Sequence, residues 1–154
     1  VDSMESLARV VDLIAAVAET CEAVFPIHPR TLRGLEASGQ IHRLRESRRV
    51  VLCEPLGYFD FQKLLATSSV VITDSGGVQE ETTFRGIPCL TLRPSTERPI
   101  TITEGTNELL AFDAGALREA MSLIRSGRFK QGRVPHLWDG HATERVVEAL
   151  NRAF

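Results

Sequence analysis

Apolar residues recur at helical spacing in three long stretches of the chain. In residues 3–20 they return every three or four positions, which predicts an amphipathic helix, and Asp2 or Ser3 can cap its start. Two later stretches have the same spacing and predict two more helices, at residues 113–127 and 141–154. Shorter helices are predicted at residues 29–39, 58–69 and 76–86.

Short apolar runs separate these helices. They lie at residues 23–29, 48–56, 70–73, 88–93 and 106–112, and they are continuous rather than alternating, which is typical of strands buried on both faces. Strands that alternate with helices in this way predict an α/β fold, a parallel sheet with helices on both faces. The stretch from residue 127 to residue 140 has no regular pattern and is predicted to be a surface loop.

Composition narrows the class of protein. A chain of 154 residues with 43% hydrophobic and 25% charged residues is typical of one globular domain. The formal net charge of −2 argues against a general nucleic-acid or membrane binder, because such proteins carry a basic excess. Cys21, Cys53 and Cys89 are odd in number and widely spaced, so we expect free thiols in a reducing cytoplasm.

The segment VVITDSGGVQEE, residues 70–81, raises the main question of this sequence. Its DSGG core also surrounds the nucleophile of trypsin-like serine proteases, which would make Ser75 a nucleophile. That class needs a preceding glycine and an all-β scaffold, whereas Thr73 precedes Asp74 here in an α/β pattern. The G-x-S-x-G turn of α/β-hydrolases does not fit either. We therefore do not expect Ser75 to attack a carbonyl.

A second hypothesis is that Ser75, Gly76 and Gly77 hold a phosphate. They lie between a predicted strand and a predicted helix, and ligands of open α/β sheets bind outside the carboxyl ends of the strands. Glycines let the backbone approach an anion, and free N–H groups at a helix start point toward it. The G-x-x-x-x-G-K-[ST] pattern of ATPases does not fit. In the alternative, Asp74 or Ser75 only caps the helix, and the spacing favours neither.

Charged residues at two neighbouring places could complete a phosphate site. Arg93 and Arg98, in the segment RPSTERP, could neutralise a diphosphate, or they could belong to a surface turn with an exposed Glu97–Arg98 pair. Glu80 and Glu81 follow the glycines in the predicted helix. One of them could bind a sugar diol, or both could simply interact with the helix dipole.

Other side chains are predicted near the same edge of the sheet. His28 lies at the end of the first predicted strand, where a structural and a catalytic role are both open. Tyr58 and Phe61 could stack on a flat base or pack in the core. The segment HLWDGH, residues 136–141, does not have the spacing of a standard zinc site, and we expect no metal there.

Five segments together resemble one known family: PIHPR, EPLGYFDFQKLL, VVITDSGGVQEET, GIPCLTLRPSTERPITITEGTN and LWDGHATERVVEAL. In this order they are similar to the C-terminal half of the non-hydrolysing UDP-N-acetylglucosamine 2-epimerases of bacteria and archaea. The resemblance covers nearly all of residues 1–154 and implies one UDP-binding, Rossmann-like domain, the C-terminal half of a GT-B-like fold. It implies an isomerase that interconverts UDP-GlcNAc and UDP-ManNAc by UDP elimination and re-addition, without a cofactor.

The resemblance also implies roles for single residues. His28, the catalytic candidate, would sit beside the leaving UDP. Six residues would bind UDP: Phe61 at the uracil, Glu81 at the ribose hydroxyls, and Ser75, Gly76, Gly77 and Arg98 at the phosphates. This agrees with the phosphate hypothesis that the residues alone allow.

The chain departs from the family pattern at its start. The family's N-terminal domain, which carries most of the acid–base carboxylates, is not in this sequence, nor is the strand that normally precedes the first helix. The resemblance therefore implies a fragment truncated before the central strand of a 3-2-1-4-5-6 sheet, which binds the nucleotide but is inactive alone.

The implied partners are the missing N-terminal domain and a second copy in a homodimer. The implied setting is cell-envelope polysaccharide biosynthesis in the cytoplasm. The alternatives are a GT-B glycosyltransferase domain, a hydrolysing epimerase domain and a non-catalytic nucleotide-binding module.

Overall fold

Helices and short strands alternate in this computed structural model, which describes residues 4–110 and 112–154. The predicted caps at Asp2 and Ser3 lie outside these residues. The strands are β1 (Ala23–Pro26), β2 (Val50–Cys53), β3 (Val71–Thr73), β4 (Cys89–Thr91) and β5 (Asn107–Leu109). The longer helices are α1 (Met4–Ala18), α2 (Pro29–Ala37), α4 (Tyr58–Thr67), α5 (Gly76–Arg85), α7 (Ala114–Arg125) and α8 (Ala142–Ala153). Two five-residue helices, which the sequence pattern did not predict, are α3 (Ile41–Arg45) and α6 (Pro99–Thr103).

The strands pair in parallel, which confirms the predicted α/β fold class, but they form two sheets rather than one. β1 pairs with β2, while β4 lies between β3 and β5. Among the described residues, β1 and β3 therefore each have a neighbouring strand on one side only. This is the arrangement expected of a 3-2-1-4-5-6 sheet without its central strand.

Helix α1 connects the two sheets through two hydrophobic clusters. Leu13 of α1 packs with Leu90 of β4 and Leu117 of α7 in the cluster beside the β3–β5 sheet. Two residues earlier, Val11 packs with Leu35 of α2 in the cluster beside the β1–β2 sheet. The amphipathic pattern of α1 thus arises because its apolar side chains serve both cores.

The two sheets differ in how their faces are covered. Leu90 of β4 faces α1 and α7, whereas its neighbour Cys89 lies against Thr82 of α5, so the larger sheet is buried on both faces. In the smaller sheet, Val24 and Val51 remain 44% and 50% exposed. One face of the β1–β2 sheet is therefore open among the described residues.

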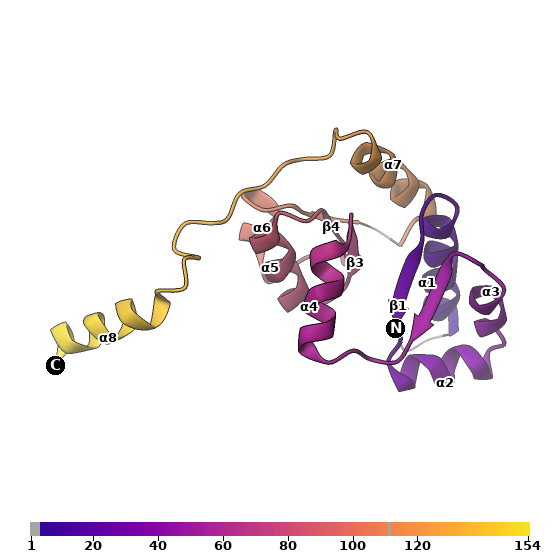
Figure 1. Ribbon diagram of the computed structural model, residues 1–154, viewed down its shortest axis with the longest axis horizontal. Helices are drawn as coiled ribbons and strands as arrows, with labels where there is room; N and C mark the ends of the chain where they lie inside the picture. The colour runs from indigo at the N-terminus through magenta and orange to yellow at the C-terminus, as the bar shows by residue number, and fades with distance from the viewer. Residues whose placement is uncertain (1–3, 111) are drawn as a thin grey trace.

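The last helix, α8, follows the extended segment of residues 128–141 and lies away from the rest of the chain (Figure 1). None of its residues is buried, and the apolar side chains of Val146, Val147 and Leu150 are half exposed or more. Packing therefore does not hold α8 against either sheet. No helix in the described part of the chain is long and apolar enough to cross a membrane.

Candidate functional site

The segment between β3 and α5 forms the centre of the candidate site. Ser75 is the N-cap residue of α5, with an extended backbone (φ −87°, ψ 127°), and its side chain makes no capping hydrogen bond. The Gln79 N–H donates to the Ser75 carbonyl at 3.3 Å. The N–H groups of Gly76, Gly77 and Val78 precede this first helical bond, so they are available to an anion. The structure does not show the alternative in which the Ser75 side chain merely caps the helix.

The packing of the chain does not require glycine at positions 76 and 77. A Cβ at Gly76 would lie 3.9 Å from its nearest neighbour, Arg98 Cγ, and one at Gly77 would lie 4.0 Å from Ser75 Oγ. A positive φ, which favours glycine, occurs at Gly86 at the end of α5 but not at these two positions. Glycine inside a helix is less stable than alanine. Neither steric contact nor backbone conformation therefore explains these two glycines.

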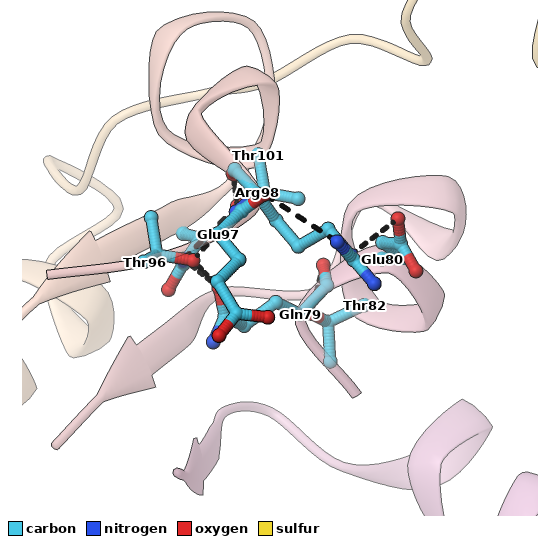
Figure 2. A network of polar contacts seen from close by, with 8 residues as sticks. Gln79, Glu80, Thr82, Thr96, Glu97, Arg98 and Thr101 are labelled. Atoms are coloured by element: carbon cyan, nitrogen blue, oxygen red, sulfur yellow. Dashed lines mark hydrogen bonds and ion pairs between the residues drawn. The ribbon is translucent and has the colours of Figure 1, made fainter. Parts of the chain in front are cut away.

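Arg98 reaches the start of α5 from the loop that follows β4. Its Nε lies 3.0 Å from Glu80 Oε1 (Figure 2), and its Nη1 donates to the backbone carbonyl of Glu97 at 3.4 Å. The alternative in which the Arg98 side chain pairs with Glu97 is not observed, since its partner is Glu80. Both paired side chains are about two fifths exposed, so the pair adds little stability and leaves part of the Arg98 side chain accessible, although its Nε is buried.

Glu81 and Phe61 lie on neighbouring helices that Gln62 joins. Gln62 Nε2 of α4 donates to Glu81 Oε2 of α5 at 2.6 Å, and Gln62 Oε1 accepts from Arg85 Nη2 at 2.7 Å. Phe61 is half-buried, and Tyr58 is 65% exposed. Core packing therefore does not account for Tyr58, and Phe61 lies beside the residue that binds Glu81.

His28 lies apart from this group, on the smaller sheet. It is the N-cap residue of α2, and its Nδ1 accepts the Arg30 N–H at 3.2 Å. Among the described residues, no hydrogen bond or ion pair joins His28 to α5 or to Arg98. The structure thus brings Gly76 and Glu80 of α5 together with Arg98. It joins Glu81 to α4, the helix of Phe61, through Gln62, and it gives His28 a capping role of its own.

Sequence reasoning missed a set of buried polar residues beneath the site. Gln79 and Asn107 are fully buried and bonded to one another, and Gln79 also accepts from Thr96 of the Arg98 loop. The polarity of Gln79 within a predicted helix was the signal that could have revealed this set, but the sequence does not show which face of that helix is buried. The described residues contain no group of three or more His, Cys, Asp or Glu side chains that could hold a metal ion.

Parallel strands with a polar helix start and an arginine-bearing loop at adjacent strand ends define a Rossmann-like α/β domain. A model of the UDP-N-acetylglucosamine 2-epimerase family matches residues 1–151. The chain therefore belongs to this family, and the resemblance seen in the sequence is confirmed.

Three comparisons with individual proteins agree. The chain is 34% identical to the UDP-N-acetylglucosamine 2-epimerase of Methanocaldococcus jannaschii over 97% of this chain and 41% of that protein. It is equally identical, 34% over 92% of this chain and 39% of the relative, to a UDP-2,3-diacetamido-2,3-dideoxy-D-glucuronate 2-epimerase of Pseudomonas aeruginosa. The crystal structure of the M. jannaschii enzyme in complex with UDP-GlcNAc and UDP has a TM-score of 0.85 at 32% identity, covering 99% of this chain and 42% of that one. The chain thus spans about two fifths of the length of these relatives.

Proposed function

We propose that this chain is the UDP-binding part of a non-hydrolysing UDP-N-acetylglucosamine 2-epimerase. The whole protein would interconvert UDP-GlcNAc and UDP-ManNAc by eliminating UDP and adding it back with C2 inverted. The observation that carries the proposal is the start of α5, where packing requires neither Gly76 nor Gly77 and Gly76 lies beside Arg98. A diphosphate suits this arrangement because glycines permit close approach, helix N–H groups donate to its oxygens and arginine neutralises its charge.

The geometry supports a separate role for each part of the nucleotide. The first turn of α5, the Ser75 hydroxyl and the Arg98 guanidinium would bind the pyrophosphate. Glu81 lies one turn further along the helix, and Gln62 occupies only its Oε2, which leaves Oε1 to accept from the ribose hydroxyls. Phe61 would lie at the uracil, and His28 would sit beside the leaving UDP.

Catalysis would need the remainder of the polypeptide. Because the chain spans only 41% of the M. jannaschii relative, we expect it to bind UDP but not to epimerise the sugar. The partners in this proposal are the N-terminal domain of the same enzyme and a second copy in a homodimer. The three free cysteines, one of them buried, support a reducing cytoplasmic location.

Calorimetric titration of the chain with UDP and with ADP tests the proposal. We expect UDP to bind and ADP not to bind, because Phe61 would lie at the uracil, the part in which the two nucleotides differ. Ser75→Ala, Glu81→Ala and Arg98→Ala should each weaken UDP binding, Arg98→Ala by about 10- to 100-fold because it removes charged hydrogen bonds.

Two matched variants control for general effects of substitution. Ser69→Ala removes an exposed hydroxyl just before β3, at the strand end away from α5, and Arg152→Ala removes an arginine from the exposed α8. Both should bind UDP as the unchanged chain does. A folded chain that does not bind UDP, or controls as weak as the site variants, would contradict the proposal.

A conversion assay on the longer protein would determine which UDP-sugar it accepts. The relatives include 2-epimerases named for two different UDP-sugars at the same 34% identity, so the family alone does not select one. We expect UDP-GlcNAc to be converted to UDP-ManNAc, with the product identified by nuclear magnetic resonance.

A further inference from the structure

A buried chain of hydrogen bonds runs beneath the candidate phosphate site. Gln79 Oε1 accepts from Thr96 Oγ1 at 2.6 Å and from Asn107 Nδ2 at 3.1 Å. Asn107 Nδ2 also donates to Thr101 Oγ1 at 3.0 Å, and its Oδ1 accepts from Thr91 Oγ1 at 2.6 Å. All but Thr96 are fully buried. The network therefore ties α5 to α6, β4, β5 and the loop that carries Arg98.

Both ends of this network bind the backbone of Arg98. Thr96 Oγ1 accepts the Arg98 N–H at 3.0 Å, and Thr101 Oγ1 donates to the Arg98 carbonyl at 2.7 Å. Arg98 itself has an irregular backbone (φ −122°, ψ 60°) at the start of α6. Figure 2 shows these contacts together with the Arg98–Glu80 pair. The network thus clamps the peptide groups on both sides of Arg98 while the side chain extends to the start of α5.

The two ends of the Gln79 amide differ, because only its Oε1 has hydrogen-bond partners in the described part of the chain. Its Nε2 is buried and has no hydrogen-bond partner among the described residues, and an unpartnered buried amide destabilises a fold. An apolar side chain of similar shape, such as methionine, would avoid that loss. What a methionine could not supply is the acceptor that holds Thr96 and Asn107.

We propose that Gln79 and Thr96 are positioning residues that hold Arg98 ready for the diphosphate. This inference rests on the proposed function. Ordering a long side chain during binding lowers affinity, and a backbone clamped in advance reduces the ordering that remains. Gln79 acts from α5, the helix whose first turn binds the same phosphates, so the network fixes the two phosphate-binding groups relative to each other.

Substitutions at Thr96 give the direct test, because this residue is only half-buried and tolerates change. Thr96→Val keeps the shape but removes both hydroxyl bonds, and it should weaken UDP binding roughly tenfold. Thr96→Ser keeps the hydroxyl and should restore binding to the level of the unchanged chain. In the Arg98→Ala background, Thr96→Val should have no further effect, because Thr96 acts through Arg98.

Gln79→Met provides an independent variant. We expect it to bind UDP roughly tenfold more weakly with little change in melting temperature, because losing the unpartnered Nε2 offsets leaving the Asn107 and Thr96 donors without their acceptor. A purely structural role for Gln79 predicts the reverse, a lower melting temperature with unchanged affinity.

The outcomes separate this inference from the proposed function. If Arg98→Ala weakens UDP binding but Thr96→Val and Gln79→Met do not, the positioning role is wrong and the UDP site stands. If Thr96→Val weakens binding equally with and without Arg98, Thr96 acts independently of Arg98 and the inference is overturned. If the unchanged, folded chain does not bind UDP, both proposals fail.

Discussion

Replacing the two glycines at the start of α5 by alanine should have opposite effects on stability and on ligand binding. Gly76 and Gly77 are the first and second residues of α5. In the chain alone, an added methyl group would meet nothing closer than 3.9 Å. A phosphate oxygen bound to these N–H groups would lie about 2.9 Å from the nitrogen, so the methyl groups would crowd the ligand rather than the protein.

The magnitudes follow from these contacts. Alanine is about 0.5–1 kcal/mol more favourable than glycine where the backbone allows it. For a chain of this size that corresponds to a rise of about 1–4 °C in melting temperature. Overpacking costs about 1–3 kcal/mol, so UDP affinity should fall by about 5- to 150-fold.

Thermal unfolding and UDP titration on the same preparations measure both effects. Gly115→Ala is the matched control, because Gly115 is the second residue of α7 and an added Cβ meets only Asp113 Oδ1 at 3.0 Å. The Gly115→Ala variant should bind UDP as the unchanged chain does. Gly105→Ala, whose Cβ would lie 2.4 Å from Thr83 Oγ1, should instead destabilise the fold. If Gly76→Ala and Gly77→Ala both retain full affinity for UDP, close approach of a phosphate is refuted.

Three other perturbations test the fold. Burial raises the pKa of the Cys89 thiol, so iodoacetamide should modify the two half-buried cysteines of the native chain but reach Cys89 only after unfolding, as mass spectrometry would show. Leu117→Ala empties a fully buried position and should cost about 2–5 kcal/mol in urea unfolding. Leu150→Ala on α8 should cost less than about 0.5 kcal/mol, and equal losses would contradict the exposed position of α8. Arg118 holds the pKa of Glu19 below its ordinary 4.5, so the pair stabilises the fold above pH 4.5 and this effect disappears as pH falls through the lower, folded-state pKa. Glu19→Gln should reduce the dependence of the unfolding free energy on pH in this range, and an unchanged pH dependence would contradict the contribution of the Glu19–Arg118 pair.

The order of the longer elements could be predicted because each carries several repeats of its pattern. Residues 58–69 and 76–86 correspond to α4 and α5 within two residues at each end. The helices α3 and α6 contain five residues each, too few to show a period. The fifth strand was predicted at residues 106–112, but β5 spans only Asn107–Leu109, because strand pairing with β4 rather than apolar composition sets its length.

Features of the candidate site that depend on neighbouring residues could be predicted from the sequence, and those that depend on distant residues could not. The position of Ser75 follows from a strand that runs directly into a helix, which the sequence shows. The partner of Arg98 does not, because the adjacent Glu97 is the obvious candidate in sequence and the fold instead brings Glu80 to it. The role of Gln79 depends on Asn107, which lies 28 residues further along the chain and is held in β5 by pairing with β4.

The candidate phosphate site belongs to the part of the chain built around one hydrophobic core, and His28 belongs to the part built around the other. The start of α5 and the Arg98 loop both join the β3–β5 sheet, whose core includes Leu90 and Leu117. His28 begins α2, whose Leu35 belongs to the core of the β1–β2 sheet. Helix α1 contributes to both cores. The distance from His28 to the candidate phosphate site therefore depends on how α1 positions the two sheets relative to each other. Under the proposed function, phosphate binding would therefore depend on the larger sheet alone, whereas alignment of His28 with a leaving UDP would require both sheets to be fixed relative to each other.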